Sequence, residues 1–160
     1  MTVKAAGLVR SRGVEVDIAG SLTDDLDLIA SYAYTDALVL EDPTYAGKRL
    51  PNVARHTGSL FLAYDVGEVG RNGNTLRIGG GVQAVGERAG INNNSYDLPG
   101  YVVFDAFATY TLQFEKPVTL QLNLKNIFDK TYYTSSIGST SYANAIGEPF
   151  NVSLTASVKF

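Results

Sequence analysis

The last ten residues, Asn151-Val-Ser-Leu-Thr-Ala-Ser-Val-Lys-Phe160, alternate polar and apolar side chains without a break. Successive side chains of an extended strand point to opposite faces. The apolar residues therefore share one face, which ends on an aromatic ring: Val152, Leu154, Ala156, Val158 and Phe160. The polar residues share the other: Asn151, Ser153, Thr155, Ser157 and Lys159. This stretch predicts a β-strand with one apolar and one polar side.

The same period of two runs through the rest of the chain. It predicts six earlier strands: Gly13–Ala19, Leu26–Asp36, Thr57–Val66, Thr75–Val85, Tyr101–Leu112 and Val118–Asn126. Alternation in every segment favours an all-β, antiparallel fold over helices. Thr2–Arg10 is a weaker candidate for an eighth strand, because it contains Ala5, Ala6 and Gly7.

The connections between these strands alternate in length. The short ones are Gly20–Asp25, Gly67–Asn74 and Gln113–Pro117, and the long ones are Ala37–His56, Gly86–Gly100 and Ile127–Pro149. Short turns on one rim and long loops on the other are typical of outer-membrane barrels. Tyr32 and Tyr34 fall near the long-loop rim, and Tyr110 and Phe160 near the short-turn rim, where membrane interfaces favour aromatic rings. The pattern predicts an antiparallel transmembrane β-barrel section of about seven meandering strands, located in the bacterial outer membrane.

Composition narrows the possible functions. The 160 residues suffice for a single domain, and a net charge of −3 disfavours a nucleic-acid partner. The absence of cysteine excludes disulfides and thiolate metal sites, and His56, the only histidine, has no partners of its kind for a metal site. No phosphate-binding loop, nucleophile elbow or His-Glu-x-x-His motif occurs. We therefore expect no enzyme activity, no metal centre and no resident cofactor.

Several segments together point to a family. They are Ser11-Arg-Gly-Val-Glu-Val16, Gly47-Lys-Arg-Leu-Pro-Asn-Val-Ala-Arg-His56, Leu98-Pro-Gly-Tyr-Val-Val-Phe-Asp-Ala106, Leu122-Asn-Leu-Lys-Asn-Ile-Phe-Asp-Lys-Thr-Tyr-Tyr133 and Gly147-Glu-Pro149. The chain resembles the C-terminal part of the β-barrel of TonB-dependent siderophore receptors, nearest the ferric hydroxamate and pyoverdine type. The segment 122–133 is the most specific match.

The resemblance implies a role in transport. Such receptors are barrels of about 22 strands with a plug domain in the lumen, and they take up ferric siderophores in a TonB-dependent manner. No segment of residues 1–160 resembles the plug, which carries the contact to TonB. We therefore expect a piece of a larger receptor, whose partners are outer-membrane lipid, the remaining barrel, the plug and, only through the plug, TonB. An odd number of strands would also leave two open edges.

The resemblance also suggests where a ligand would bind. Family members hold bulky ferric siderophores with aromatic side chains of the outer loops. Four tyrosines lie in the predicted long loops and are the candidate ligand contacts: Tyr45, Tyr96, Tyr133 and Tyr142. Asn126–Lys130 is interpreted as structural, because Asn and Asp readily bond nearby backbone. Gly79–Gly81 is interpreted as a bend or bulge that adjusts the curvature of the barrel.

Two other functions remain open. The first is a stand-alone or self-assembling small outer-membrane barrel with a structural role, in which copies pair through their open strand edges. The second is a soluble β-barrel that binds an apolar ligand. The soluble barrel predicts that the aligned apolar side chains face inward into a core.

Overall fold

The computed structural model describes residues 7–70, 72–137 and 143–158 of the chain. None of these residues forms a helix long and apolar enough to cross a bilayer. All regular elements in this part are strands: β1 Leu8–Ser21, β2 Leu26–Glu41, β3 His56–Glu68, β4 Thr75–Val85, β5 Arg88–Ala89, β6 Asp97–Leu98, β7 Tyr101–Leu112, β8 Val118–Lys125, β9 Tyr133–Ser136, β10 Asn144–Ile146 and β11 Asn151–Val158.

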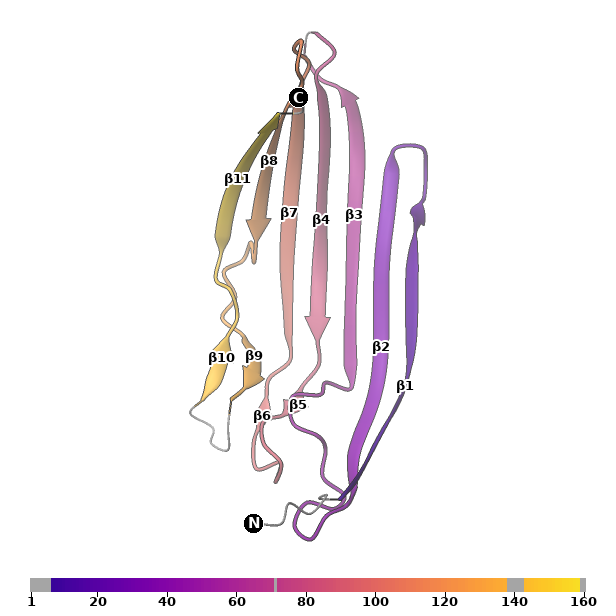
Figure 1. The fold of residues 1–160 in the computed structure, drawn as a ribbon, viewed down its shortest axis with the longest axis vertical. Helices are drawn as coiled ribbons and strands as arrows, with labels where there is room; N and C mark the ends of the chain where they lie inside the picture. Colours follow the sequence, from indigo (N-terminus) through magenta and orange to yellow (C-terminus); the bar gives the residue numbers. More distant parts are fainter. Residues whose placement is uncertain (1–6, 71, 138–142, 159–160) are drawn as a thin grey trace.

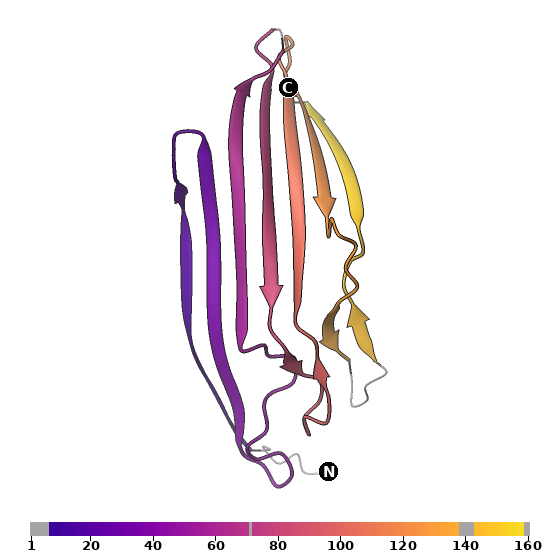
Figure 2. The same ribbon diagram turned by 180° about the vertical axis from the view of Figure 1, so that it is seen from behind.

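Seven of these strands form one sheet in the order β1-β2-β3-β4-β7-β8-β11, and every pair in it is antiparallel. The predicted all-β meander of seven strands is confirmed. Figure 1 shows the long strands side by side in a single layer, and Figure 2 shows the same order from behind. β1 and β11 are the two edges of the sheet. The short hairpins β5–β6 and β9–β10, which were not predicted, lie within the long connections.

The first two strands are longer than predicted. β1 spans Leu8–Ser21 instead of Gly13–Ala19, and β2 continues to Glu41. The extension is held by paired charges, since Arg10 and Arg12 both donate to the carboxylate of Asp36, at 3.0 and 3.1 Å. The separate strand considered at Thr2–Arg10 is not found in its described part, because Leu8–Arg10 belong to β1. Phe160, the predicted end of the last strand, lies outside the described residues.

One face of the sheet is apolar and uncovered. Val14, Ile18 and Leu154 are 62%, 55% and 69% exposed. The buried apolar residues of the described part are few and mostly small: Ala37, Ala54, Ala63, Ala89, Leu98 and Val103. A soluble barrel would hide its aligned apolar side chains, so the prediction of an inward-facing apolar core is wrong. A membrane-facing surface, in contrast, exposes such a band to lipid.

The opposite face carries the polar residues of the alternation. On it two phenylalanines stack, Phe61 from β3 and Phe107 from β7, with ring centroids 5.7 Å apart and planes 4° from parallel. The strand between them is β4, whose Gly79 and Gly81 leave the room for the rings. A Cβ on Gly79 would lie 2.2 Å from the Phe107 ring, and one on Gly81 would lie 2.4 Å from Phe61.

The interpretation of Gly79–Gly81 as a bulge is therefore wrong. Pairing with β3 and with β7 is continuous through all three glycines. The irregularity in the β3–β4 pair lies instead between Asp65 and Gly67. Gly79 and Gly81 make room for side-chain packing across three strands, and the predicted bend stays a prediction.

The two ends of the sheet differ as the connection lengths predict. The short turns β1–β2, β3–β4 and β7–β8 lie at one end, and the long connections with the small hairpins lie at the other (Figure 1). In an outer-membrane barrel the long loops face the outside of the cell. The sheet therefore holds the three long loops together as one layer.

Candidate functional site

Asparagine and tyrosine side chains tie the three long loops to one another. The first loop follows β2, the second contains β5–β6, and the third contains β9–β10. Asn94 of the second loop accepts from the backbone N–H of Arg49 at 2.7 Å and donates to its carbonyl at 2.9 Å. Asn52 of the first loop does the same with Ser136 of the third, at 2.7 and 3.2 Å. Each asparagine side chain therefore bonds both the N–H and the C=O of one residue in a neighbouring loop, as a paired residue of an adjacent strand would.

Tyr96 supplies the third connection. Its hydroxyl lies 2.6 Å from Ser136 Oγ and 3.3 Å from Asn144 Oδ1, so it joins the second loop to the third. Its ring packs on Gly90, where a Cβ would approach the ring to 2.1 Å. The predicted role of Tyr96 as a ligand contact stays a prediction. In the structure its hydroxyl bonds residues of the third loop.

Between the loops lies a cavity of about 610 Å³. All three loops contribute to its wall: Tyr45, Pro51, Asn52, Gly90, Ile91, Asn92, Asn93 and Ser136. Tyr45 is half-buried and follows a turn in which Asp42 accepts from its backbone N–H at 2.8 Å. Of the three predicted tyrosines within the described residues, Tyr45 is the one that lines this wall.

The other two tyrosines have different surroundings. Tyr133 is half-buried in β9, and its backbone carbonyl accepts a hydrogen bond from the guanidinium of Arg88. Tyr142 lies outside the described residues. Tyr45, Tyr96 and Tyr133, the three that the structure describes, do not all line the loop cavity, and the ligand contacts of all four tyrosines stay predictions.

Arg88 was not predicted as a functional residue. Only 2% of it is exposed, and its guanidinium lies 5.5 Å from the centre of the Tyr101 ring. Its Nη1 has no hydrogen-bond partner within the described residues. Tyr132 packs on the same Tyr101 ring at 4.4 Å, and this burial, with Tyr101 close by, raises the pKa of the Tyr132 phenol above its ordinary value. A buried cation thus lies among neutral rings below the loop layer.

The loop layer also carries a partly exposed ion pair. Arg49 forms an ion pair with Asp97 of the second loop, and Glu87 lies 3.9 Å away. Asn52 and Asn94 both adopt positive φ, at 64° and 54°, a conformation that asparagine tolerates better than most residues. The sequence placed both in long connections, but nothing local indicated which distant backbone each would bond.

Asn126–Lys130 is structural, as predicted. Asn126 is 3% exposed, and its side chain donates to the carbonyls of Lys130 and Glu148, at 2.9 and 3.0 Å. Its backbone N–H donates to Asp105 at 2.8 Å. Asp129 then accepts from the N–H of Phe150 at 3.0 Å. These bonds close the exit of β8 against the start of β11.

The sheet has an apolar outer face and a polar inner face, and its long loops are joined by hydrogen bonds at one rim. These features define part of the wall of an outer-membrane β-barrel. Residues 1–127 match the family described as TonB dependent receptor-like, beta-barrel. The chain belongs to this family, whose members are outer-membrane proteins.

Individual relatives agree. The chain is 38% identical to the metal-pseudopaline receptor CntO of Pseudomonas aeruginosa, over 98% of this chain and 22% of the receptor. It is 37% identical to an uncharacterized TonB-dependent receptor of Haemophilus influenzae, over 99% and 48%, and 31% identical to the ferrichrome outer membrane transporter/phage receptor of Escherichia coli, over 96% and 20%. The chain spans about half or less of these relatives.

The solved structure of BauA, the ferric preacinetobactin receptor of Acinetobacter baumannii, superposes on the chain with a TM-score of 0.87 at 26% identity, over 98% of this chain and 23% of BauA. The yersiniabactin receptor FyuA of Yersinia pestis superposes with a TM-score of 0.84 at 17% identity, over 97% and 24%, a likeness of fold alone. The sheet and its loops thus correspond to about a quarter of such receptors.

Proposed function

We propose that this chain forms part of the wall and of the outer loop layer of a receptor that takes up a ferric siderophore in a TonB-dependent manner. The observation that carries the proposal is the cavity between the three hydrogen-bonded long loops. These loops lie at the end of the sheet that faces the outside of the cell in an outer-membrane barrel. A bulky ligand needs such a preformed concavity with a few polar groups.

The ligand class we propose is a ferric siderophore of the hydroxamate or pyoverdine type. Relatives whose names state such ligands include the ferrichrome transporter, the ferric-pyoverdine M114 receptor and the ferrioxamine B receptor, at 31%, 32% and 32% identity. The metal-pseudopaline receptor is more similar, at 38%. A metal complex of another small chelator is therefore the second candidate ligand.

The partners we propose follow from the two surfaces of the sheet. Among the described residues, no strand pairs with the outer edge of β1 or of β11, and lipid does not tolerate open edges, so we propose that further strands cover them. The polar inner face, with its Phe61–Phe107 pair, is the surface that a plug domain would touch. TonB would act through that plug and not on this chain.

Open edges also support a second arrangement, in which copies of this chain complete one another. Electrophoresis of heated and unheated samples in detergent separates the two arrangements. A heat-sensitive band at a multiple of 17.2 kDa would mean self-assembly. Aggregation on removal of detergent, without such a band, supports a wall that needs other strands.

Binding of ferric complexes tests the transport proposal. The chain has ten tyrosines and no tryptophan, so quenching of tyrosine fluorescence by ferrichrome or ferric pyoverdine reports the complex directly. Tyr45→Ala, in the cavity wall, is expected to weaken binding about tenfold, the loss of a well-placed aromatic contact. Thr44→Ala, the adjacent exposed residue outside the wall, is the matched control.

The proposal fails if neither ferric complex quenches the fluorescence. It also fails if both variants bind as the unchanged chain does. Quenching by a nickel or zinc chelate in place of the ferric complexes would favour the second candidate ligand.

A further inference from the structure

A trough of small residues crosses the apolar face near the long-loop end. Four residues of adjacent strands lie in one register row: Tyr32 of β2, Gly58 of β3, Ala84 of β4 and Val102 of β7. Neighbouring strands lie about 4.8 Å apart, so the outer two residues stand about 14 Å from each other. The two residues between them have almost no side chain, which leaves a hollow in the membrane-facing surface.

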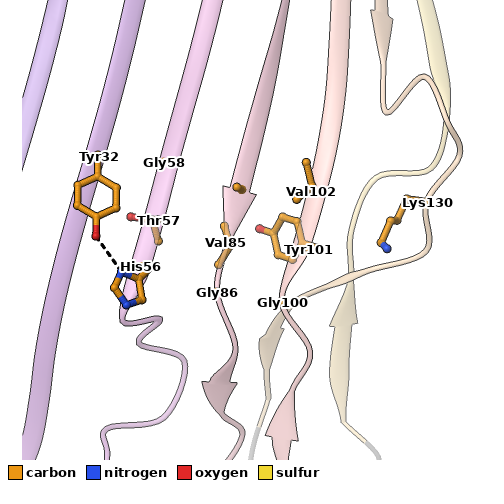
Figure 3. A pocket seen from close by; sticks show the side chains of 11 residues that line it. Tyr32, His56, Thr57, Gly58, Val85, Gly86, Gly100, Tyr101, Val102 and Lys130 are labelled. Carbon is orange, nitrogen blue, oxygen red and sulfur yellow. Dashed lines mark hydrogen bonds between the residues drawn. The ribbon is translucent and has the colours of Figure 1, made fainter.

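The hollow extends toward the loops. Gly86 and Gly100 continue its floor, and His56 and Lys130 contribute to its wall, enclosing about 520 Å³. Figure 3 shows Tyr32 and His56 on one side and Lys130 across from them, with the glycine backbones between. The trough is therefore bordered by an aromatic–imidazole pair on one side and a cation on the other.

Both polar groups at the border keep binding capacity. The Tyr32 hydroxyl lies 2.8 Å from Nδ1 of His56, which fixes the imidazole and leaves its Nε2 without a partner in the described residues. Lys130 Nζ likewise forms no ion pair there. Asp129 and Glu148, two acidic residues of the same connection, have other partners, since Asp129 accepts from the Phe150 N–H and Glu148 pairs with Lys125.

The height of the trough indicates its surroundings. It lies between the apolar band, which includes Leu60 and Leu62, and the loop layer, at the level of Tyr32 and Tyr34. Tyrosine favours the membrane–water interface, and basic side chains there attract anionic lipid. Acyl chains would lie along the band, and a headgroup would reach the trough.

We propose that this trough binds the phosphate headgroup of an outer-leaflet membrane lipid. Lys130 pairs with the phosphate, His56 Nε2 donates or accepts at the same headgroup, and Gly58 and Ala84 let the glycerol or sugar lie against the strands. The site shares no lining residue with the loop cavity, so it does not depend on the transported ligand.

The test measures lipid retained by the chain extracted from outer membranes in mild detergent. Native mass spectrometry follows the binding of added lipid A, the phosphorylated glycolipid of the outer leaflet. Lys130→Gln is expected to weaken binding about fivefold, the effect of one interfacial cation. Lys125→Gln removes the same charge from the opposite face and is expected to leave binding unchanged.

A second variant tests shape without changing charge. Ala84→Leu fills the trough and is expected to weaken lipid A binding by a similar factor, while the apolar face accepts the larger side chain. Equal losses for Lys130→Gln and Lys125→Gln would overturn the proposal. So would unchanged binding in Ala84→Leu, or displacement of the lipid by soluble glucosamine phosphate at equal concentration.

Discussion

The two faces of the same seven strands are built on different principles. The apolar face leaves side chains such as Val14 and Leu154 exposed and makes few specific contacts. The opposite face is cross-linked, by Arg77 with Asp27 and Asp65 and by the stacked rings of Phe61 and Phe107. The stability of the apolar face therefore depends on the lipid around it. The stability of the polar face depends on contacts between its own side chains. The same substitution should therefore change the free energy of unfolding by different amounts at two neighbouring positions of a strand, because these positions point to opposite faces.

Charge on the two faces gives the largest expected difference. Leu122→Arg places a cation on the membrane-facing side of β8 and is expected to cost about 2–4 kcal/mol near mid-depth. Asn123→Arg, the next residue, points to the polar face and should cost less than about 1 kcal/mol. Urea titration of the two variants folded into vesicles measures the gap. Equal costs would mean that the assignment of the faces is wrong.

The glycines of β4 give the next difference. Gly79→Ala puts a Cβ 2.2 Å from the Phe107 ring and 2.6 Å from the Leu62 carbonyl oxygen, and should destabilise the fold by about 1–3 kcal/mol. Gly80→Ala faces lipid, its closest contact is the Asp105 carbonyl oxygen at 3.1 Å, and it should cost less. The same urea titration checks both, with Ala106→Gly as a control for intrinsic propensity.

A smaller effect is expected in the loop layer. Tyr96→Phe removes a hydroxyl bonded to Ser136 and Asn144 while keeping the ring on Gly90, so the loops should loosen by about 1 kcal/mol. Hydrogen exchange of the Ser136 and Gly90 amides should quicken while that of β4 stays unchanged. Unaltered exchange at both loop amides would show that Tyr96 does not tie the loops together.

The contrast between faces was predictable from the sequence, and the cross-links were not. A period of two needs only neighbouring residues, so Leu122 and Asn123 could be assigned to opposite sides without coordinates. The role of Gly79 depends on Phe61 and Phe107, which lie on other strands. Likewise Asn52 and Asn94 resemble ordinary turn residues until the loops are brought together. Local sequence patterns thus predict the strands and the two faces of the sheet. The loop cavity depends on contacts between residues that are far apart in the sequence.

The smallest expected effect concerns the ion pairs on the polar face. Arg77→Gln removes the contacts with Asp27 and with Asp65, the latter at 3.2 Å. These side chains are about 40% exposed, so water and salt screen them and the loss should be below about 1 kcal/mol. The loss should also shrink between 0.05 and 0.5 M salt, roughly the range over which screening lengths fall below 10 Å. A loss that exceeds that of Gly79→Ala, or that does not respond to salt, would mean that the polar face is dry and covered. The polar face would then be shielded from water, like the face of a sheet that packs against a second layer.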